Sequence, residues 1–350
     1  MLALDHAIFS LQAAGGISKW WLMHTLCMAE RFGPSVLHLG PYSNHNVLLG
    51  EVRAGRMPVS RGKLSWFWPW RPVHLPETAR VFHSSYLRTC QRGSNVASVF
   101  TFHDDVWLND NSLTSRLKRS CVERCLRRAR IVHCVSSFSK SRLLRRFPWV
   151  PEERIRVVYH GVTPPGNSSG KIETSVAGQF VLWVGNRHHY KNGGIAFEAA
   201  ARLPDTRLVC VGGEPLSADE HGTIERLGLT PRFHHFPEAP TGMLNWLYAN
   251  ATALWYPSLI EGFGLPVIEA AARGCPVLGA SGHAVEEIGR GWPILTAQPS
   301  GEWLAAMTEL LRHDPTLRAR LASEGIGLAR QYTWERYTSE MAGLYAEART

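Results

Sequence analysis

Short apolar runs alternate with longer amphipathic stretches along the whole chain. A run of about four to eight apolar residues between turn-forming residues is typical of a buried parallel strand, whereas apolar residues three or four apart indicate a helix. The pattern predicts strands at residues 79–83, 97–103, 131–136, 155–160, 180–185, 207–212, 252–256 and 276–280. It predicts helices at residues 17–31, 113–130, 194–202 and 265–273.

This alternation indicates an α/β protein with a doubly wound parallel sheet in each half of the chain. Such sheets bind ligands at the carboxyl ends of their strands, so two facing sheets would place a site in the cleft between them. Residues 163–178, TPPGNSSGKIETSVAG, are rich in Pro, Gly and Ser and predict a linker. We therefore expect domains at residues 1–165 and 166–335, followed by a C-terminal helix at 336–350 that packs back on the first domain.

The composition fits this two-domain interpretation. The chain has 350 residues, 45% of them hydrophobic and 19% charged, and domains of about 100–200 residues are usual. No apolar run reaches the ~18 residues of a membrane-spanning helix, and the opening residues do not resemble a signal peptide. We expect a cytoplasmic protein. The seven cysteines are scattered without a CxxC pair, which favours reduced thiols over disulfides or a zinc ribbon.

The net charge of +9 is unevenly distributed. Residues 1–175 carry 24 basic and 11 acidic side chains, and residues 113–147 alone carry eleven basic residues against one acidic residue. A basic first half favours an anionic partner, and anionic lipid at the inner face of the cell membrane is one candidate. The Trp-rich segment 61–72, RGKLSWFWPWRP, belongs either to the core or to a membrane interface. No RNA-binding signature supports a nucleic-acid partner.

Two carboxylates stand eight residues apart in the segment 257–280, PSLIEGFGLPVIEAAARGCPVLGA. Glu261 precedes a predicted helix, and Glu269 lies inside it about two turns later, so both can point into one pocket. Gly262 and Gly264 form a tight loop, and the helix that starts at Leu265 offers its free N–H groups there. The segment therefore suits an anion or the hydroxyls of a sugar.

A second candidate lies in residues 184–194, VGNRHHYKNGG, directly after a predicted strand. Arg187 and Lys191 precede the next helix, and two cations beside a glycine loop and a helix N-terminus could clamp a diphosphate. A solvated surface pair is the alternative interpretation of these two residues. The adjacent histidines 188–189 and 234–235 have no third ligand at helical spacing, so we expect no metal site.

The two segments resemble the EGFGLPxxEA and GxRxxYKN patterns of the retaining family-4 glycosyltransferases, which have the GT-B fold of two facing Rossmann-like domains. Tyrosine here stands where the family usually has arginine before the lysine. Four further segments resemble the family in its expected order, namely residues 14–17 (AGGI), 101–105 (TFHDD), 135–141 (VSSFSKS) and 158–162 (VYHGV).

The resemblance implies a role for each matching residue. Arg187 and Lys191 would stabilise the leaving diphosphate, Glu261 would hold hydroxyls of the donor sugar, and His103 would lie beside that sugar. These four are the expected catalytic residues. Glu269 would hold the nucleotide ribose. The expected donor-binding residues are Gly15, Gly16, Gly185, Asn192, Gly262, Phe263, Gly264, Leu265 and Glu269. No metal or other cofactor is expected.

The resemblance also implies a substrate class. We expect transfer of a hexosyl group, with mannosyl from GDP-mannose favoured, to a saccharide or lipid-linked acceptor in bacterial surface polysaccharide, lipopolysaccharide or glycolipid assembly. The protein would then be peripheral at the inner face of the membrane. Two alternatives stay open: a nucleotide-sugar epimerase on the same fold, and a non-catalytic, membrane-associated protein that binds a nucleotide sugar.

Overall fold

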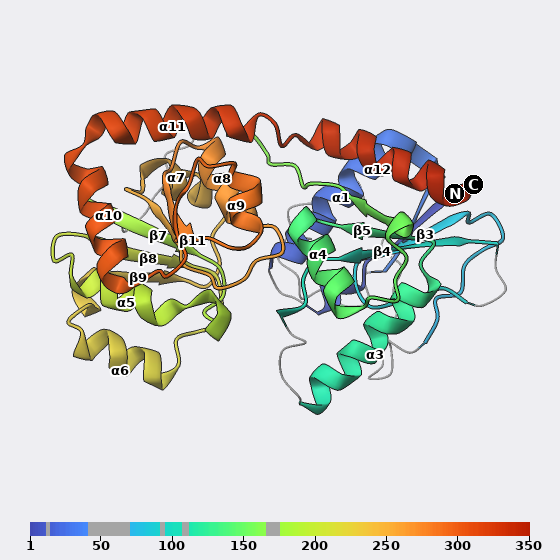
Figure 1. The fold of residues 1–350 in the computed structure, drawn as a ribbon, viewed down its shortest axis with the longest axis horizontal. Helices are drawn as coiled ribbons and strands as arrows, with labels where there is room; N and C mark the ends of the chain where they lie inside the picture. The colour runs from blue at the N-terminus through green and yellow to red at the C-terminus, as the bar shows by residue number, and fades with distance from the viewer. Residues whose placement is uncertain (12–14, 41–70, 92–94, 107–111, 166–175) are drawn as a thin grey trace. The chain divides into compact units, whose positions relative to one another are not determined.

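The computed structural model describes residues 1–350 except 12–14, 41–70, 92–94, 107–111 and 166–175. The chain divides into two compact units, one of Met1–Gly161 with Trp334–Thr350 and one of Val162–Thr333 (Figure 1). The boundaries expected at 165 and 335 lie within a few residues of these divisions. The Trp-rich residues up to 70 and most of the expected linker lie outside the described residues.

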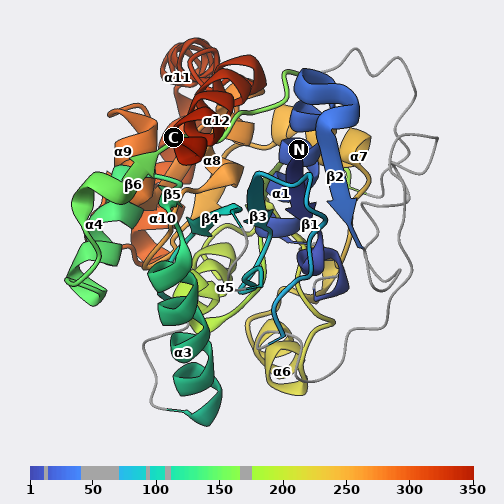
Figure 2. The ribbon, with the colours of Figure 1, turned by 90° about the vertical axis from the view of Figure 1, so that its right-hand side faces the viewer.

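Unit 1 contains a six-stranded parallel sheet in the order β2-β1-β3-β4-β5-β6. The strand labels in Figure 2 follow that order. The order reverses between the first and third strands, as in a doubly wound sheet. Its strands are β1 (Leu2–Asp5), β2 (Val36–Leu39), β3 (Val81–Ser84), β4 (Ala97–Phe102), β5 (Ile131–Cys134) and β6 (Ile155–Val157).

The helices of unit 1 include one from the far end of the chain. The last helix, α12, packs against α1, β3 and β4, and Figure 1 shows it alongside α1. Among the described residues of unit 1, the helices are α1 (Gly16–Phe32), α3 (Leu113–Arg128), α4 (Ser137–Arg146) and α12 (Trp334–Arg349), with short 3-10 turns at η1 (Ala7–Ser10), η2 (Gly33–Ser35) and η5 (Glu152–Arg154).

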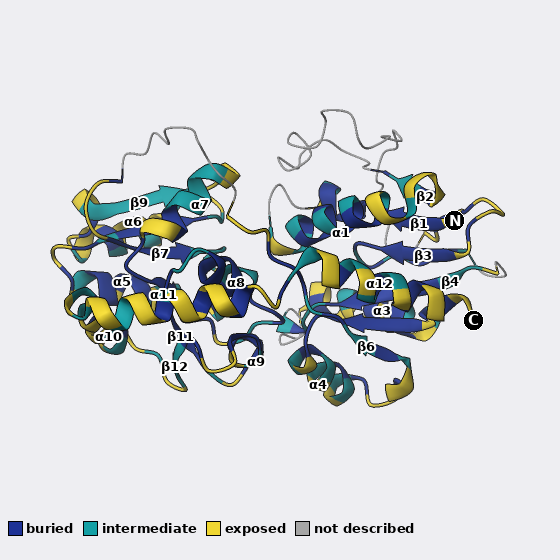
Figure 3. Cartoon of the chain, turned by 90° about the horizontal axis from the view of Figure 1, so that it is seen from above, coloured by how far each residue is buried: buried dark blue, intermediate teal, exposed yellow. Residues whose placement is uncertain are grey.

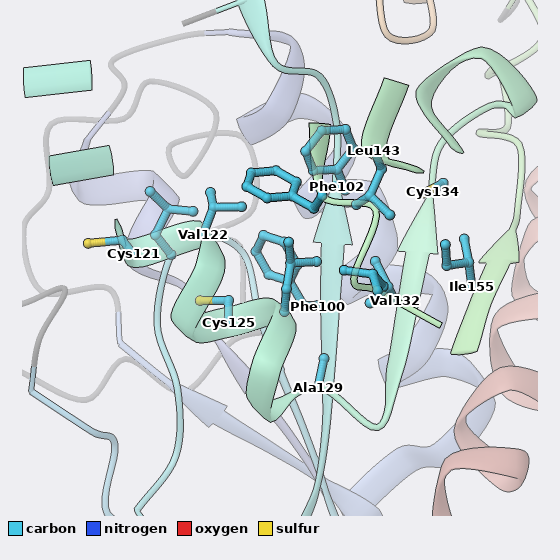
Figure 4. Packing of buried hydrophobic residues seen from close by; sticks show 14 residues of the cluster. Phe100, Phe102, Cys121, Val122, Cys125, Ala129, Val132, Cys134, Leu143 and Ile155 are labelled. Atoms are coloured by element: carbon cyan, nitrogen blue, oxygen red, sulfur yellow. The ribbon is translucent and has the colours of Figure 1, made fainter. Parts of the chain in front are cut away.

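Helix α3 shows how the sequence pattern builds this core. Cys121, Val122, Cys125 and Leu126 recur at helical spacing and are buried. They pack with residues of β4 and β5 such as Phe100, as Figure 4 shows. The positions between them are polar or charged, so α3 has one apolar face. All seven cysteines of the chain are free and buried.

A chain of buried hydrogen bonds holds α12 to the rest of unit 1. Trp20 Nε1 donates to Tyr337 Oη (2.9 Å), and Tyr337 Oη lies 2.8 Å from His24 Nδ1. His24 Nε2 lies 2.9 Å from Tyr345 Oη, which in turn lies 2.5 Å from His83 Nδ1. Tyr337 and Tyr345 belong to α12, whereas the other members belong to α1 and β3.

The series of hydrogen bonds continues across the sheet, and all of its donors point the same way along it. His83 Nε2 lies 2.8 Å from Thr101 Oγ1, which lies 3.0 Å from His133 Nδ1, and His133 Nε2 lies 3.0 Å from the Val158 carbonyl oxygen. Because a carbonyl only accepts and the indole of Trp20 only donates, neutral histidines must each donate through Nε2 and accept through Nδ1. Every hydroxyl and imidazole in this hydrogen-bond chain then donates once and accepts once.

The polypeptide leaves unit 1 after Gly161 and returns to it at Trp334, and these two residues contact each other. A Cβ on Gly161 would lie 2.7 Å from the Trp334 backbone nitrogen and 2.6 Å from its ring, so the contact leaves no room for a side chain. The first unit is therefore one continuous structure made from two separate stretches of sequence.

Unit 2 contains a second six-stranded parallel sheet, in the order β12-β11-β10-β7-β8-β9. Figure 3 shows its strands largely buried and its helices exposed along their outer sides. The strands are β7 (Phe180–Val184), β8 (Arg207–Val211), β9 (Phe233–Phe236), β10 (Leu254–Tyr256), β11 (Val277–Ala280) and β12 (Ile294–Thr296). The predicted fold class, two doubly wound α/β domains, is confirmed.

The connections in unit 2 are helical throughout. They comprise α5 (Gly193–Ala201), α6 (Ala218–Arg226), α7 (Thr241–Asn250), α8 (Leu265–Ala272), α9 (Ala284–Gly289), α10 (Gly301–His313) and α11 (Pro315–Ala329), with 3-10 turns at η6 (His189–Lys191) and η7 (Thr230–Arg232). Within the described parts of the chain, no helix is both long and apolar enough to span a bilayer.

Candidate functional site

The centre of the candidate site is an ion pair between Lys191 and Glu261. Lys191 ends η6 directly after β7, and Glu261 lies in the loop between β10 and α8. Because β7 and β10 are neighbours in a parallel sheet, their carboxyl ends meet at one edge. Lys191 Nζ lies 2.6 Å from Glu261 Oε1, and the two side chains are only 10% and 11% exposed. The sequence placed both residues in the site, and the structure brings them into contact.

Two tyrosines surround the Lys191 ammonium. Its Nζ lies 5.1 Å from the ring centre of Tyr256, 5.4 Å from that of Tyr190 and 3.4 Å from Tyr256 Oη. Tyr256 also hydrogen-bonds to Glu261, and burial followed by the Glu261 charge raises its pKa well above 10. The phenol therefore stays neutral and donates to the carboxylate. Sequence reasoning missed Tyr256, although it ends the strand directly before the Glu261 loop.

His283 lies near the same pair. Its Nδ1 accepts from the Val285 N–H (3.3 Å), so Nε2 carries the proton and donates to the Ser258 carbonyl oxygen (2.9 Å). Burial, and to a lesser degree the Lys191 charge, lowers the pKa of His283, while Glu261 opposes the shift. A neutral His283 thus adds no second cation beside Lys191.

Glu269 has partners different from those of Glu261. It is a buried residue of α8, and Tyr248 of α7 donates its hydroxyl to Glu269 Oε2 at 3.0 Å. Arg273 donates to the Glu269 backbone carbonyl (3.0 Å) and to Asn245 Oδ1 (2.8 Å). The Tyr248 phenol therefore orients the Glu269 carboxylate, and the Arg273 guanidinium holds the backbone of Glu269.

The structure places Arg187 away from the contacts of Lys191. Arg187 Nε donates to Glu220 Oε1 (2.6 Å), Nη1 contacts the Gly212 carbonyl (3.2 Å) and His235 Nε2 (2.8 Å), and Nη2 contacts the Glu214 carbonyl. Arg187 and Lys191 share none of these partners. The expected two-cation clamp is therefore not assembled here, because every nitrogen of the guanidinium has a hydrogen-bond partner beside β8 and β9.

The loop before α8 provides backbone donors near Glu261. Gly264 has φ +96°, a conformation that side-chain-bearing residues rarely adopt, and an added Cβ would lie 3.1 Å from Val285. No side chain caps the N-terminus of α8. Pro266 has no N–H and the Val267 N–H donates to the Gly264 carbonyl oxygen (2.9 Å), so Leu265 carries the first-turn N–H that could meet an anion or a hydroxyl. Gly262, Phe263 and Leu265 complete the expected donor-binding loop. Gly185 and Asn192 flank Lys191 at the end of β7 and the start of α5.

The site residues expected in unit 1 lie at the start of α1 and the end of β4. Gly15 is the N-cap of α1, again without a side-chain cap, and Gly16 is its first residue. His103 follows β4, and its ring meets Trp20 edge-on with 4.8 Å between ring centres. Burial and the neighbouring His133 lower the pKa of His103 to about 3, so its ring is neutral. His103 Nε2 is shielded and has no hydrogen-bond partner among the described residues.

The described residues contain no group of three or more His, Cys, Asp or Glu side chains arranged to hold a metal ion. The adjacent histidines take other roles. His235 Nε2 lies 2.8 Å from Arg187 Nη1 and 3.0 Å from the Gly212 carbonyl oxygen, and the ring of His188 stacks on Tyr190 with 6.2 Å between ring centres.

Comparison with known proteins relates the chain to glycosyltransferases. Residues 29–164 match the family described as Glycosyltransferase Family 4, and residues 168–327 match the family described as Glycosyl transferases group 1. A D-inositol 3-phosphate glycosyltransferase of Mycobacterium leprae is 30% identical over 180 residues, which cover 49% of this chain and 42% of that protein. The chain thus spans about half the length of the curated relatives it matches.

Solved structures agree in fold over nearly the whole chain. Sucrose-phosphate synthase from Thermosynechococcus elongatus has a TM-score of 0.75 at 19% identity, with 99% of this chain and 98% of that chain covered. Anabaena HepE in complex with UDP-glucose has a TM-score of 0.76 at 17% identity, with 99% of both chains covered. One glycosyltransferase family match thus lies on each unit, and the fold of the two units agrees with that of the solved glycosyltransferase structures.

Proposed function

We propose that the protein transfers a hexosyl group from a nucleotide-diphosphate sugar to an acceptor hydroxyl, with retention of anomeric configuration. The observation that carries this proposal is the Lys191–Glu261 pair at the carboxyl edge of the unit 2 sheet. Glu269 and the uncapped N-terminus of α8 follow Glu261 in the same segment. A cation, two carboxylates and a backbone N–H at a helix start are groups that suit a diphosphate joined to two sets of hydroxyls.

Binding of a donor would replace the contact between Lys191 and Glu261. Separating a nearly buried ion pair is costly unless each charge finds a new partner. A nucleotide sugar supplies both partners, because its diphosphate is an anion for Lys191 and its sugar hydroxyls are donors for Glu261. In the transition state negative charge grows on the leaving diphosphate, so Lys191 would stabilise that state more than the ground state.

The remaining residues would position the donor. Glu269 would accept from the ribose hydroxyls, and the amides of Gly262, Phe263 and Gly264 would contact the sugar or the phosphate. His103 would meet a sugar hydroxyl through its neutral ring. We assign the charge stabilisation to Lys191 rather than Arg187, since Arg187 would first have to leave Glu220 and the Glu214 carbonyl.

The finer proposal is a mannosyl donor such as GDP-mannose, used in bacterial surface polysaccharide, lipopolysaccharide or glycolipid assembly. It rests on the GxRxxYKN pattern alone. Calorimetric titration with GDP, UDP, dTDP, ADP and their sugars tests it. We expect one base to bind at least about tenfold more tightly than the others, and a preference for UDP over GDP would overturn the mannosyl assignment.

Turnover assays separate the transferase from its two alternatives. An epimerase would change the donor sugar with no acceptor present, and a non-catalytic binding protein would bind nucleotide without any turnover. A transferase consumes the donor only as an acceptor or water receives the sugar. Sugar-nucleotide chromatography with and without added lipid-linked or free saccharide acceptors distinguishes these outcomes.

We also propose that unit 1 docks on an anionic membrane surface through α3. Leu113 and Leu117 are 72% and 42% exposed, and Arg116 and Arg119 on the same helix are exposed as well. Exposed leucines among arginines suit a lipid interface, where each basic residue contributes about 1 kcal/mol. A lipid-linked acceptor would then be reached at that surface.

Liposome flotation tests this docking. We expect binding to vesicles with anionic lipid at low salt, and the double variant Arg116→Glu/Arg127→Glu should lose at least about tenfold in partitioning. The matched control Arg320→Glu/Arg330→Glu reverses two exposed charges in unit 2 and should bind like the parent. Equal loss in both variants, or no binding by the parent protein, would contradict a docking surface on α3.

A further inference from the structure

We propose that Tyr248 is the positioning residue for the nucleotide ribose, because its hydroxyl fixes the Glu269 carboxylate that receives the ribose hydroxyls. This inference rests on the donor role proposed above for Glu269. It adds a residue that no sequence motif pointed to, and it assigns that buried residue a specificity function.

The contact between Tyr248 and Glu269 is a buried hydrogen bond between two adjacent helices. Tyr248 lies on α7 and is 1% exposed, while Glu269 lies on the adjacent helix α8 and is 8% exposed. The phenol oxygen lies 3.0 Å from Glu269 Oε2. The carboxylate ends a side chain with three rotatable bonds, so a fixed donor at one oxygen removes most of its freedom.

The direction of this hydrogen bond is fixed. Burial, and then the Glu269 charge, hold the pKa of Tyr248 well above 10. The phenol is therefore protonated at any working pH and donates, while the carboxylate accepts. A carboxylate offers about four lone-pair sites, so one bond from Tyr248 is compatible with a ligand diol at the same group.

Arg273 supports the same arrangement from the backbone side. Its guanidinium lies 5.8 Å from the centre of the Tyr248 ring. It bonds the Glu269 carbonyl oxygen and Asn245 Oδ1, and so links the main chain of α8 to a side chain in the middle of α7. Tyr248 sets the orientation of the carboxylate, and Arg273 sets the position of the helix that carries it.

The test compares ribose with deoxyribose on matched variants. Calorimetry would measure the affinities of GDP, 2′-deoxy-GDP and 3′-deoxy-GDP, and of the UDP series, for the parent, Tyr248→Phe and Tyr332→Phe. The control Tyr332→Phe also removes a buried hydroxyl in unit 2, one that bonds the Ile288 carbonyl at 2.8 Å. Both changes keep the aromatic ring, and thermal melts verify that both variants fold.

We expect the parent to prefer the ribonucleotide by about tenfold or more, as for a hydrogen bond to a charged group. Tyr248→Phe should reduce this preference to about twofold, because the affinity for the ribonucleotide falls while the affinity for at least one deoxy form stays unchanged. KM for the donor should rise more than kcat falls. Tyr332→Phe should keep the full preference.

Each contrary result has a distinct meaning. A parent protein that binds ribo and deoxy forms equally would overturn the ribose role of Glu269, and this inference with it. A parent that prefers ribose while Tyr248→Phe keeps the whole preference would overturn the role of Tyr248 alone. In a Glu269→Ala background, Tyr248→Phe should not lower the affinity for the ribonucleotide any further. If Tyr248 had only a structural role, its substitution would lower that affinity in this background as well.

Discussion

Lys191 and Glu261, seventy residues apart in sequence, meet at 2.6 Å in a nearly buried ion pair at the ends of neighbouring strands. The contact joins the two motifs that the sequence marked separately. It also means that neither residue can be changed without leaving a charge that has lost its partner.

Lys191→Ala should therefore abolish transfer while the protein stays folded. We expect kcat to fall about 100- to 1,000-fold, as when one preorganised donor to a developing negative charge is removed. The orphaned Glu261 should cost about 3 kcal/mol of stability, which a melting curve and near-UV circular dichroism would measure. Near-normal turnover would refute the role of Lys191, and Lys191→Arg, which keeps the charge, should retain more activity than the alanine variant.

Arg187→Ala should give the opposite pattern. Although burial raises the pKa of Glu220, hydrogen bonds from Ser217 and Arg187 outweigh it and hold that pKa below its usual value. Loss of Arg187 removes four contacts around the end of β8, and we expect unit 2 to lose about 2–3 kcal/mol. Nucleoside diphosphate affinity should change less than about threefold. A tenfold or greater loss of affinity with an unchanged melting temperature would instead identify Arg187 as a diphosphate ligand.

Unit 1 should lose stability steeply in mild acid. Burial is the main cause that lowers the pKa of six of its histidines, to about 3 for His6 and His103, to about 4 for His133, and well below 6.5 for His24, His83 and His160. The unfolded chain binds protons that the folded chain cannot, so stability is complete above about pH 6.5 and falls as the pH drops toward 4. Each histidine contributes up to about 1.4 kcal/mol per pH unit.

Chemical denaturation from pH 8 to pH 4.5 would measure this effect. The free energy of unfolding should be flat above pH 7 and should decline with a slope of more than one proton below pH 6. A flat profile down to pH 5 would show that these histidines are not buried in their neutral form.

Tyr345→Phe should weaken the attachment of α12. The hydroxyl donates to His83 Nδ1 and accepts from His24 Nε2, so its loss leaves two buried groups without partners. We expect a cost of about 2–4 kcal/mol for unit 1, measured by thermal melts against Tyr332→Phe. Hydrogen exchange should rise along α12. A cost below about 1 kcal/mol would mean that water or rearranged side chains replace the tyrosine.

The apolar pattern predicted the buried central strands well, since β3–β6, β7, β8, β10 and β11 each lie within or against a predicted range. It missed four others for physical reasons. Strands β9, FHHF, and β12 are only partly buried along their whole length, so neither has a clear apolar run. Strand β1 has only three apolar residues before Asp5, and β2 is only partly buried and contains His38, so neither gives a clear apolar run.

The sequence could not predict which polar groups would pair with residues far away along the chain. The pattern marked Arg187 as a cation beside a glycine loop, but its partners lie 25 to 48 residues away, and nothing local selects Glu220 over a phosphate. The histidines of β3 and β5 each stand alone in an apolar run. Only the sheet register brings them beside Thr101 and forms a chain. Lys191, Glu261 and Glu269 lie in local motifs, so the sequence alone could nominate them as site residues.

The junction of Gly161 with Trp334 makes unit 2 an insertion in the chain of unit 1. During synthesis the sheet of unit 1 emerges first, yet its helix α12 follows only after all of unit 2 has been made. Until then the surface that receives Tyr337 and Tyr345 stays uncovered, so the second unit should mature before the first. It also means that a direct splice from Gly161 to Trp334 would yield unit 1 as a single uninterrupted polypeptide. Truncation before Trp334 would remove α12 from unit 1 and leave the sequence of unit 2 intact.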